Sequence, residues 1–305
     1  MKKHGWILQS KRQGDLGFDL INIVLVGLIT LLFAYPLYLV LISAFSTPNA
    51  VYRGEVLFWF QGSNWSGLQR VLSDDSLLRG YGNTIYYTVV GTAINLIMTT
   101  MSAFVLSRRS FALRTPLTVM FTITMFFGGG MIPTYLLVRN LNLLNTVWAL
   151  VLPGAISTWN LIIGRTFLNM TISEELFDAA AIDGCNNFTF FIRIVLPLSS
   201  TLIAVLGLFY AVGHWNSYWS ALLYITKTDM YPLQLVLRDI LLQSQLSAQM
   251  MPDATDMENL QAHMQEIAES VKYIVVLAAV APMMIVFPFV EKYFVKGVMI
   301  GSIKG

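Results

Sequence analysis

Charged side chains are scarce in this sequence. Only 12% of its 305 residues are charged, whereas 56% are hydrophobic, and the mean hydropathy is +0.64. A typical soluble domain carries about 25% charged residues, so water alone could not keep this surface in solution and lipid must cover much of it. The net charge of +2 is too small to indicate a nucleic-acid partner.

The sequence lacks the residues required for disulfide bonds, for a metal site and for a phosphate-binding loop. A single cysteine, Cys185, excludes an internal disulfide framework, and no CxxC motif or Cys/His cluster indicates a metal site. No GxxxxGK[ST] phosphate loop occurs, so the chain cannot bind ATP by that route. We therefore expect no catalytic residue, no metal and no cofactor bound by this chain itself.

Long charge-free runs dominate the sequence instead. A helix that spans a membrane needs about 20 mostly apolar residues, and six runs meet or approach that length. They are Leu20–Ser46, Gly80–Ser107, Thr115–Val138, Asn140–Gly164, Ile194–Thr226 and Tyr273–Val290. We read the first run as too long to be a cleaved signal peptide. The sequence thus predicts an all-α membrane protein with six transmembrane helices in a domain over residues 20–292.

Lysine and arginine placement predicts the orientation of these helices. With the N-terminus in the cytoplasm, the cytoplasmic segments hold twelve basic residues and the longer outer segments hold seven. The short loop from Arg108 to Arg114 gives the clearest indication. Both termini are therefore expected inside. The tails are residues 1–19 and 293–305, and the outer segments are 47–79, expected to form a small ordered cap, and 227–270, with two amphipathic helical patterns.

The third predicted span is interrupted by Gly128, Gly129 and Gly130, followed by Pro133. Three glycines cost about 3 kcal/mol of helix propensity relative to alanine. Two explanations remain open. The glycines can allow close packing of helices, or they can form a hinge whose freed backbone groups line a pathway.

The segment Thr171–Ser199 has the pattern of a helical hairpin between the fourth and fifth spans. Thr171 and Glu174 have the spacing of a capping box, and Glu175 also suits the positive end of a helix dipole. Gly184 is expected to end the first helix in a left-handed conformation. We take residues 171–195 as the hairpin.

A second short helix should follow, with Phe188, Phe191 and Ile192 on one side. Leu196-Pro197 should then form the first turn of the fifth span. A compact hairpin with small and aromatic residues suits docking into a groove of another protein, although an ordinary amphipathic hairpin is the alternative.

The hairpin resembles the cytoplasmic signature of permease subunits from binding-protein-dependent ABC importers. That signature is Glu-Ala-Ala, three residues, Gly, and a hydrophobic stretch that ends in Leu-Pro. This sequence has Asp178 in place of the usual Glu, and Cys185 where alanine is common. The segments YPLYLVLISAFSTPNAV, GGGMIPTYLL, GHWNSYW and FVKGVMIGSIKG resemble the carbohydrate branch of the MalG-like superfamily, of the kind typified by YtcP and LplB.

The resemblance implies the type I ABC importer permease fold and a coupling helix that sits in a cleft of the ATPase subunit. The coupling residues would be Glu175, Asp178, Ala179, Ala180, Asp183, Gly184, Leu196 and Pro197. The implied partners are two ATP-binding subunits that hold ATP and Mg, a second permease subunit and an extracytoplasmic solute-binding protein. A heterodimer, an oligosaccharide substrate and the bacterial inner (cytoplasmic) membrane are the expected details.

Sugar recognition needs aromatic platforms and hydrogen-bonding amides, which indicates a candidate substrate pathway. Its residues would be Gly129, Trp159, Asn160, Trp215, Asn216, Tyr218 and Trp219. Helix packing or an interfacial aromatic belt is the competing explanation for these clusters. His214 is read as a packed or interfacial histidine in preference to a proton relay. The acidic second half of the outer segment 227–270 would contact the binding protein or be a solvated face.

Three other functions agree less well with the sequence. A secondary sugar transporter driven by ions usually needs ionisable residues within the membrane, and the predicted spans lack Asp, Glu, Lys and Arg at their centres. An intramembrane serine protease needs a Ser/His pair, and no GxSG-like motif accompanies His214. A bare channel would not need the hairpin. The expected function is therefore ATP-driven sugar import, with a secondary sugar transporter as the alternative.

Overall fold

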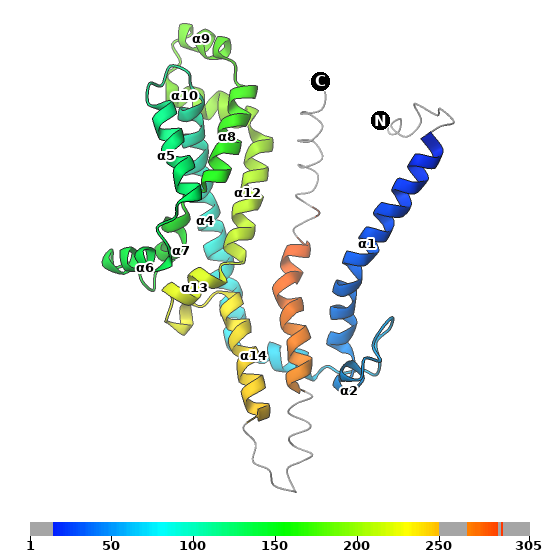
Figure 1. The fold of residues 1–305 in the computed structure, drawn as a ribbon. Coiled ribbons are helices and arrows are strands. Elements are labelled where there is room, and N and C mark those ends of the chain that lie inside the picture. Colours follow the sequence, from blue (N-terminus) through cyan, green and yellow to red (C-terminus); the bar gives the residue numbers. More distant parts are fainter. Residues whose placement is uncertain (1–14, 250–266, 286–287, 289–305) are drawn as a thin grey trace. The chain divides into compact units, whose positions relative to one another are not determined.

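The computed structural model describes residues 15–249, 267–285 and 288, and these residues form helices and no strands. They fall into two compact units (Figure 1). One holds the described residues up to 71 together with those from 243 to 277, and the other holds residues 72–242 together with those from 278 onward. Outside the described residues lie 1–14 of the predicted tail 1–19, the whole predicted tail 293–305, the acidic stretch 253–266, and residues 286–287 and 289–290 of the sixth predicted span.

The first unit contains α1 (Asp15–Phe45), α2 (Pro48–Tyr52), most of α3 (Ser66–Leu72) and the start of a helix at Ile267–Ile285. The most apolar stretch of α1 has a mean hydropathy of 2.4 and no buried residue, so lipid or another chain must cover it. Ile42, Ala50 and Val56 form a small core where α1 meets the following segment. This segment has the ordered character that we predicted for the residues after position 47.

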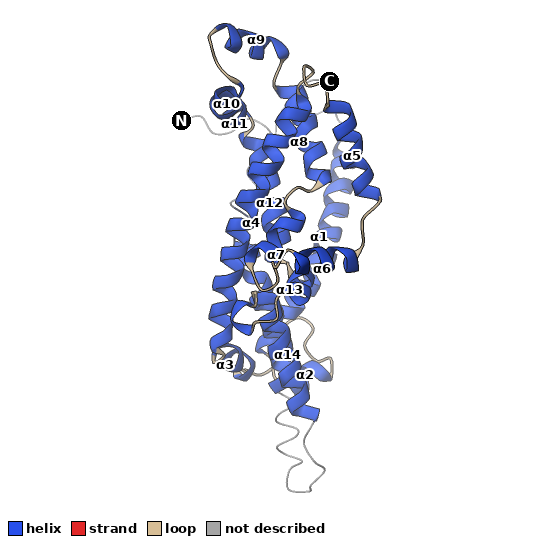
Figure 2. Ribbon diagram, turned by 90° about the vertical axis from the view of Figure 1, so that its left-hand side faces the viewer, coloured by secondary structure: helices blue, strands red, loops and turns tan. Residues whose placement is uncertain are grey.

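The second unit is organised around α4 (Asp75–Ser107). This helix begins five residues before the predicted span Gly80–Ser107, because the Asp74 side chain accepts a hydrogen bond from the backbone N–H of Ser76 and caps the helix. α4 therefore begins within the predicted outer segment 47–79. α8 (Thr158–Thr171) and α12 (Ser200–Trp215) pack along α4 (Figure 2). Their shared core includes Ala103, Leu161 and Leu206.

The predicted break at the three glycines is present. α5 (Arg114–Phe126) and α6 (Met131–Asn140) meet at an angle of 114°. Gly130 has φ 86° and ψ 168°, a conformation that is essentially restricted to glycine. A Cβ atom at Gly128 or Gly129 would meet nothing within 4 Å, so these two glycines do not provide close packing among the described residues.

The fourth predicted span is displaced along the sequence. Its helix is divided into α7 (Val147–Val151), a 3₁₀ turn (Leu152–Gly154) and α8, with a bend of 53°. Within the charge-free run Asn140–Gly164 we expect a helix from near Asn145, which is close to the start of α7, but the predicted end at Gly164 comes too soon because α8 continues to Thr171. α8 continues past the charged residue Arg165 because that side chain donates from Nε to the carbonyl oxygen of Leu106, at 3.1 Å.

The fifth predicted helix was also placed wrongly, since Pro197 does not begin a helix that runs to Tyr224. α10 (Asn187–Phe190), a π-helical turn (Phe191–Val195) and α11 (Leu196–Leu198) come first, and the chain then bends by 82° at Ser199 into α12. After a break at residues 216–217, α13 (Tyr218–Tyr224) follows. α14 (Leu233–Gln249) corresponds to the first predicted amphipathic pattern of the outer segment.

Three single helices and three bent pairs are long and apolar enough to cross a membrane. The single helices are Gly17–Phe45, Asp75–Ser107 and Ile267–Ile285. If each bent pair forms one span, the described residues provide six spans, in agreement with the predicted all-α membrane fold.

Candidate functional site

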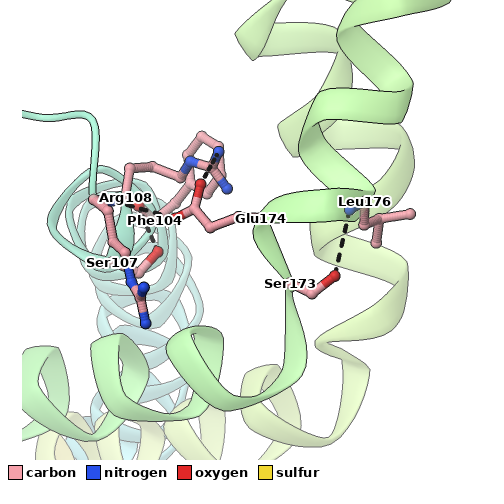
Figure 3. A network of polar contacts seen from close by, with 7 residues as sticks. Phe104, Ser107, Arg108, Ser173, Glu174 and Leu176 are labelled. Carbon is pink, nitrogen blue, oxygen red and sulfur yellow. Dashed lines mark hydrogen bonds and ion pairs between the residues drawn. The ribbon is translucent and has the colours of Figure 1, made fainter.

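The hairpin between α8 and α12 begins with α9 (Glu174–Ile182). Its N-cap is Ser173, whose hydroxyl accepts a hydrogen bond from the backbone N–H of Leu176 (Figure 3). The predicted capping box from Thr171 is therefore wrong, because α8 continues through Thr171 and leaves Ser173 in the extended conformation that a cap requires. The pKa of Glu175 is lowered by its own backbone N–H, by the Ser173 side chain and by the charge of Arg109.

The end of α9 has the predicted glycine turn. Gly184 has φ 77°, and its backbone N–H donates to the carbonyl oxygen of Ala181 at 3.0 Å. The backbone N–H of Cys185 donates to the carbonyl oxygen of Ala180 at 2.9 Å. These two bonds form a Schellman motif, and they reverse the chain sharply into α10.

The two faces of α9 differ in burial. Ala180 is buried against the core of the second unit, whereas Asp178, Ala179 and Asp183 are exposed. Ile182 is 86% exposed although it is a large apolar residue. α9 lies at one end of the second unit (Figures 1 and 2), so its outer face is open to contact another chain.

Aromatic side chains hold the base of the hairpin. The rings of Phe104 and Phe191 lie 5.4 Å apart, and Phe177 meets Phe190 edge-to-face at 5.1 Å. The predicted side of the second short helix is wrong in detail, since Phe190 and Phe191 are buried while Phe188 is 65% exposed and Ile192 is 44% exposed. The π-helical turn explains the difference, because it shifts the register by which residues share a face.

Leu196 and Pro197 lie in the short helix α11, before the bend at Ser199. Leu196 packs against the core of the second unit, and Pro197 is exposed. Both residues therefore join the hairpin to the bend and do not form the first turn of α12.

A cavity of about 280 Å³ lies beside the C-terminal half of α12. Two predicted pathway residues, Asn216 and Trp219, line it, and the Trp219 side chain is 70% exposed. The buried hydroxyl of Ser217 has no hydrogen-bond partner among the described residues and also belongs to the lining. The remaining lining residues are Leu150, Gly154, Phe209, Tyr210, Gly213, His214 and Ser220.

A buried polar network supports this cavity. The Asn95 side-chain amide donates to the carbonyl oxygens of Gly154, at 2.6 Å, and Ala155, at 2.9 Å, which the break between α7 and α8 leaves without helical partners. The Asn95 oxygen lies 2.6 Å from His214 Nε2. Since the amide hydrogens face the carbonyls, His214 Nε2 must be the donor. The Tyr210 hydroxyl accepts a bond from the Ser157 N–H at 3.1 Å.

The other predicted pathway residues do not line this cavity. Trp215 is buried, and its Nε1 donates to the carbonyl oxygen of Ala279 at 3.2 Å. Tyr218 packs against a separate apolar cluster. Trp159 is exposed and Asn160 is buried, so the pair does not present one shared surface.

The sequence did not reveal the hydrogen-bonding roles of Asn95 and Tyr210 in this network, and His214 was predicted to be only a packed or interfacial histidine. Asn95 and Thr99 were visible as polar residues one helical turn apart in an apolar span, which is the signal that could have identified them. Among the described residues, no group of three or more His, Cys, Asp or Glu side chains could hold a metal ion.

The chain is similar to known transport proteins over nearly its whole length. It is 38% identical over 288 residues to Protein LplC of Bacillus subtilis (strain 168), which covers 94% of this chain and 95% of that protein. It is 35% identical over 288 residues to the polygalacturonan/rhamnogalacturonan transport system permease protein YtcP of the same organism, covering 94% of this chain and 98% of that protein. No family model matches the sequence.

A solved structure has the same fold. The crystal structure of a bacterial ABC transporter involved in the import of the acidic polysaccharide alginate contains a chain with a TM-score of 0.79 and 28% identity, which covers 94% of this chain and 100% of that chain. The bent helices, the hairpin and these similarities define a membrane-spanning pore subunit with no catalytic function of its own. The chain belongs to the permease subunits of ABC sugar importers, as the resemblance of its hairpin predicted.

An ABC importer permease works with ATPase and binding-protein components and transports a carbohydrate, so these partners follow from the family. The predicted secondary sugar transporter is not favoured.

Proposed function

We propose that this chain forms half of the pore of a heterodimeric importer for an oligosaccharide, and that α9 transmits the action of the ATPase. The open face of α9 carries this proposal. Its outer residues Ala179, Ile182 and Asp183 are exposed at one end of the second unit, while Ala180 and the aromatic base are buried. A small, partly apolar helical face held on a rigid base suits insertion into a groove of a partner.

The energy for transport comes from outside this chain. Two ATP-binding subunits would hold ATP and Mg, close on ATP and push the hairpin, and an extracytoplasmic binding protein would deliver the sugar. In this scheme the exposed residues Glu175, Asp178, Ala179, Asp183 and Gly184 form the contact with the ATPase subunit, and Ala180 anchors the buried face of α9. Leu196 and Pro197 join the hairpin to the bend before α12.

The cavity beside α12 is the proposed point of contact with substrate in this half of the pore. Trp219 offers an exposed ring for stacking on a pyranose, and Asn216 and His214 offer polar groups for hydroxyls. Gly129, at the break before α6, is proposed as a hinge. Two similar proteins are named for acidic polysaccharides, which supports an oligosaccharide derived from one.

The other predicted pathway residues do not line this cavity and are assigned no direct contact with substrate in this half of the pore. Trp159 presents an exposed ring, whereas Asn160, Trp215 and Tyr218 support neighbouring elements by packing. A role for these residues in the pathway requires the second permease subunit, which supplies the other half of the pore.

The arrangement in the membrane follows from the distribution of basic residues. We place the domain 20–292 in the bacterial inner membrane with the tails 1–19 and 293–305 and the hairpin in the cytoplasm. The segments 47–79 and 227–270 then face outward, and α4 enters the first of these at Asp75.

The test is purification of the complex from mild detergent, followed by reconstitution into proteoliposomes. Oligosaccharides from digests of polygalacturonan and alginate would be offered with candidate binding proteins, and maltotriose would serve as the neutral comparison. We expect a second permease and an ATPase to co-purify, and uptake to require ATP. Uptake driven by an ion gradient without ATP would contradict the proposal.

The hairpin itself is tested at Gly184. Gly184→Trp should abolish uptake, because the added side chain would occupy the space that the ATPase groove needs. Gly184→Ala is the matched control, because it carries the same strain of positive φ, about 1 kcal/mol, without the bulk, and a Cβ there meets nothing within 4 Å. Loss of uptake with Asp183→Ala would agree with this role, whereas full uptake with Gly184→Trp would exclude it.

A further inference from the structure

α4 differs from the other spans of the second unit in being continuous. The pairs α5 with α6, α7 with α8, and α10–α11 with α12 are bent by 114°, 53° and 82°. α4 has 33 residues without a break, which corresponds to about 50 Å at 1.5 Å per residue. One continuous helix therefore runs through a unit whose other described spans are broken.

The end of α4 near the hairpin is joined to α9. Arg108 Nη2 lies 2.9 Å from Glu174 Oε2 (Figure 3). The guanidinium carbon of Arg108 lies 3.7 Å from the centre of the Phe177 ring. The Arg109 backbone N–H donates to Glu174 Oε1 at 3.4 Å. The Arg108 side chain is only 10% exposed, and a charge with so little water contact is costly unless it is paired. The pair therefore holds the first turn of α9 against α4.

The middle of α4 is joined to two of the broken spans. Asn95 holds the carbonyl oxygens at the α7–α8 break and also contacts His214 of α12. One turn further, the Thr99 and Tyr210 hydroxyls lie 2.6 Å apart. Both contacts reach the cavity described above, so a displacement of α4 would be felt at the proposed substrate site.

The opposite end of α4 is joined to the segment that precedes α14. The Thr84 hydroxyl accepts a bond from the Leu233 N–H at 2.7 Å. The Asn83 side chain donates to the carbonyl oxygens of Asp229, at 2.9 Å, and Tyr231, at 3.0 Å. This segment lies in the outer part of the chain in the proposed topology, where a binding protein would dock.

We propose that α4 is a strut that couples the hairpin to the outer segment 229–233, and that Arg108 is the positioning residue at its input. The inference rests on the proposed role of the hairpin. Motion of α9 is transmitted to α4 through the Arg108–Glu174 pair and the Phe177 contact. The hydrogen bonds of Asn83 and Thr84 then transmit the motion of α4 to the outer segment 229–233. Residues 83 and 108 are about 37 Å apart along the helix.

The experiment measures ATP hydrolysis by the whole complex in nanodiscs, without and with the candidate binding protein that supports uptake by the wild type. Arg108→Gln should keep basal hydrolysis and subunit assembly but reduce the stimulation by the binding protein by about tenfold, within the usual range of coupling between sites. Arg109→Gln is the matched control, because it removes the same charge from an exposed neighbour and keeps the backbone N–H. The charge exchange of Arg108→Glu with Glu174→Arg should restore most of the stimulation.

A second arm separates a strut from a local contact. Asn83→Ala should also reduce stimulation, and its combination with Arg108→Gln should be no worse than either alone. Mutations at independent sites so far apart normally have free-energy effects that add, so their fold losses of stimulation would multiply in the double variant. Losses that multiply in this way would overturn the proposal. It would equally be overturned if Arg108→Gln behaved like Arg109→Gln.

Two further results keep the outcomes distinct. If Arg108→Gln does not assemble, Glu174→Gln, at a side chain that is 38% exposed, gives the same comparison. Failure of the proposed function would appear as absent ATP-dependent uptake in the wild type, or as uptake that persists in the Gly184→Trp variant. Either result differs from an intact importer in which Arg108 has no effect.

Discussion

At the scale of single residues, capping determines where α9 of the hairpin begins. Ser173 and Thr171 are both hydroxyl residues before the acidic pair, and sequence spacing alone favoured Thr171. The structure selects Ser173, because α8 uses Thr171 as its own last residue. A cap must lie outside both helices, and the end of α8 was not visible in the charge-free pattern.

Ser173→Ala should destabilise α9 by about 1 kcal/mol, since it removes a hydrogen-bond acceptor from the first turn. Thr171→Ala is the matched control and should change the stability of α9 little. Hydrogen exchange of the α9 amides in the purified complex measures both. Equal loss of protection in the two variants would contradict the assignment of the cap.

The same residues predict a pH dependence. Glu175 has a lowered pKa in the folded hairpin, so its ionised form contributes stability that is fully present above its ordinary value of 4.5 and is lost as the pH falls through the folded value. Protection of α9 should therefore be constant from pH 7 down to about pH 5 and decrease below that. Glu175→Gln should remove this decrease.

Two tryptophans of one cluster should respond differently to substitution. Trp219→Ala should raise the KM for oligosaccharide uptake by about tenfold, which is about 1.4 kcal/mol, and leave the yield of complex unchanged, because its ring is exposed beside the cavity. Trp215→Ala should lower stability by about 3 to 5 kcal/mol, because that side chain is buried. Uptake kinetics and thermal melting of the complex separate the two effects. A normal KM in Trp219→Ala would remove this residue from the pathway.

At the scale of helices, glycine has two different uses in α4. A Cβ atom at Gly91 would overlap the His214 ring, whereas a Cβ atom at Gly82 would meet nothing within 4 Å. Gly91 therefore permits α12 to approach α4, and Gly82 only weakens the helix.

Gly82→Ala should stabilise the complex by up to about 1 kcal/mol through helix propensity. Gly91→Ala should destabilise it despite the same gain, because the His214 ring must move and its bond to Asn95 is disturbed. Melting temperatures of the two variants, measured in the same detergent, provide the comparison. A higher melting temperature for Gly91→Ala would show that the ring moves without cost.

Helix boundaries could be predicted from the sequence only where a particular residue type ends the helix. The break at Gly128–Gly130 and the turn at Gly184 followed from glycine itself, because positive φ has few alternatives. The bend at Ser199 did not, since no glycine marks it and the backbone N–H of Ser199 still bonds to the carbonyl oxygens of Val195 and Leu196. Burial was equally hidden: Trp215 and Trp219 are chemically alike, and only packing makes one structural and the other exposed.

At the scale of the whole molecule, a large apolar surface of the described chain is left uncovered. The most apolar stretch of α1 has no buried residue, and the cavity beside α12 is open. Sequence could predict six spans and the family, because composition and local motifs specify them. It could not determine which aromatic residues lie beside the cavity, because that depends on contacts between helices that are distant in the sequence.

The single cysteine of the chain provides a test of orientation in the membrane. Cys185 follows the Gly184 turn and is partly exposed, and no other cysteine competes for a thiol reagent. In the proposed topology a membrane-impermeant maleimide should label it in inside-out vesicles and not in right-side-out vesicles. Cys185→Ala, which places the residue common in the family at this position, is the control for background labelling.

Assembly should then slow the same reaction, because the ATPase subunit would cover the hairpin. We expect Cys185 to react at least about tenfold more slowly in the assembled complex than in the chain separated from its ATPase, since the contact must open for the reagent to enter. Labelling from the outer side would reverse the topology. Labelling at an equal rate in both preparations would mean that the ATPase docks elsewhere, and α9 would lose its role as the coupling helix.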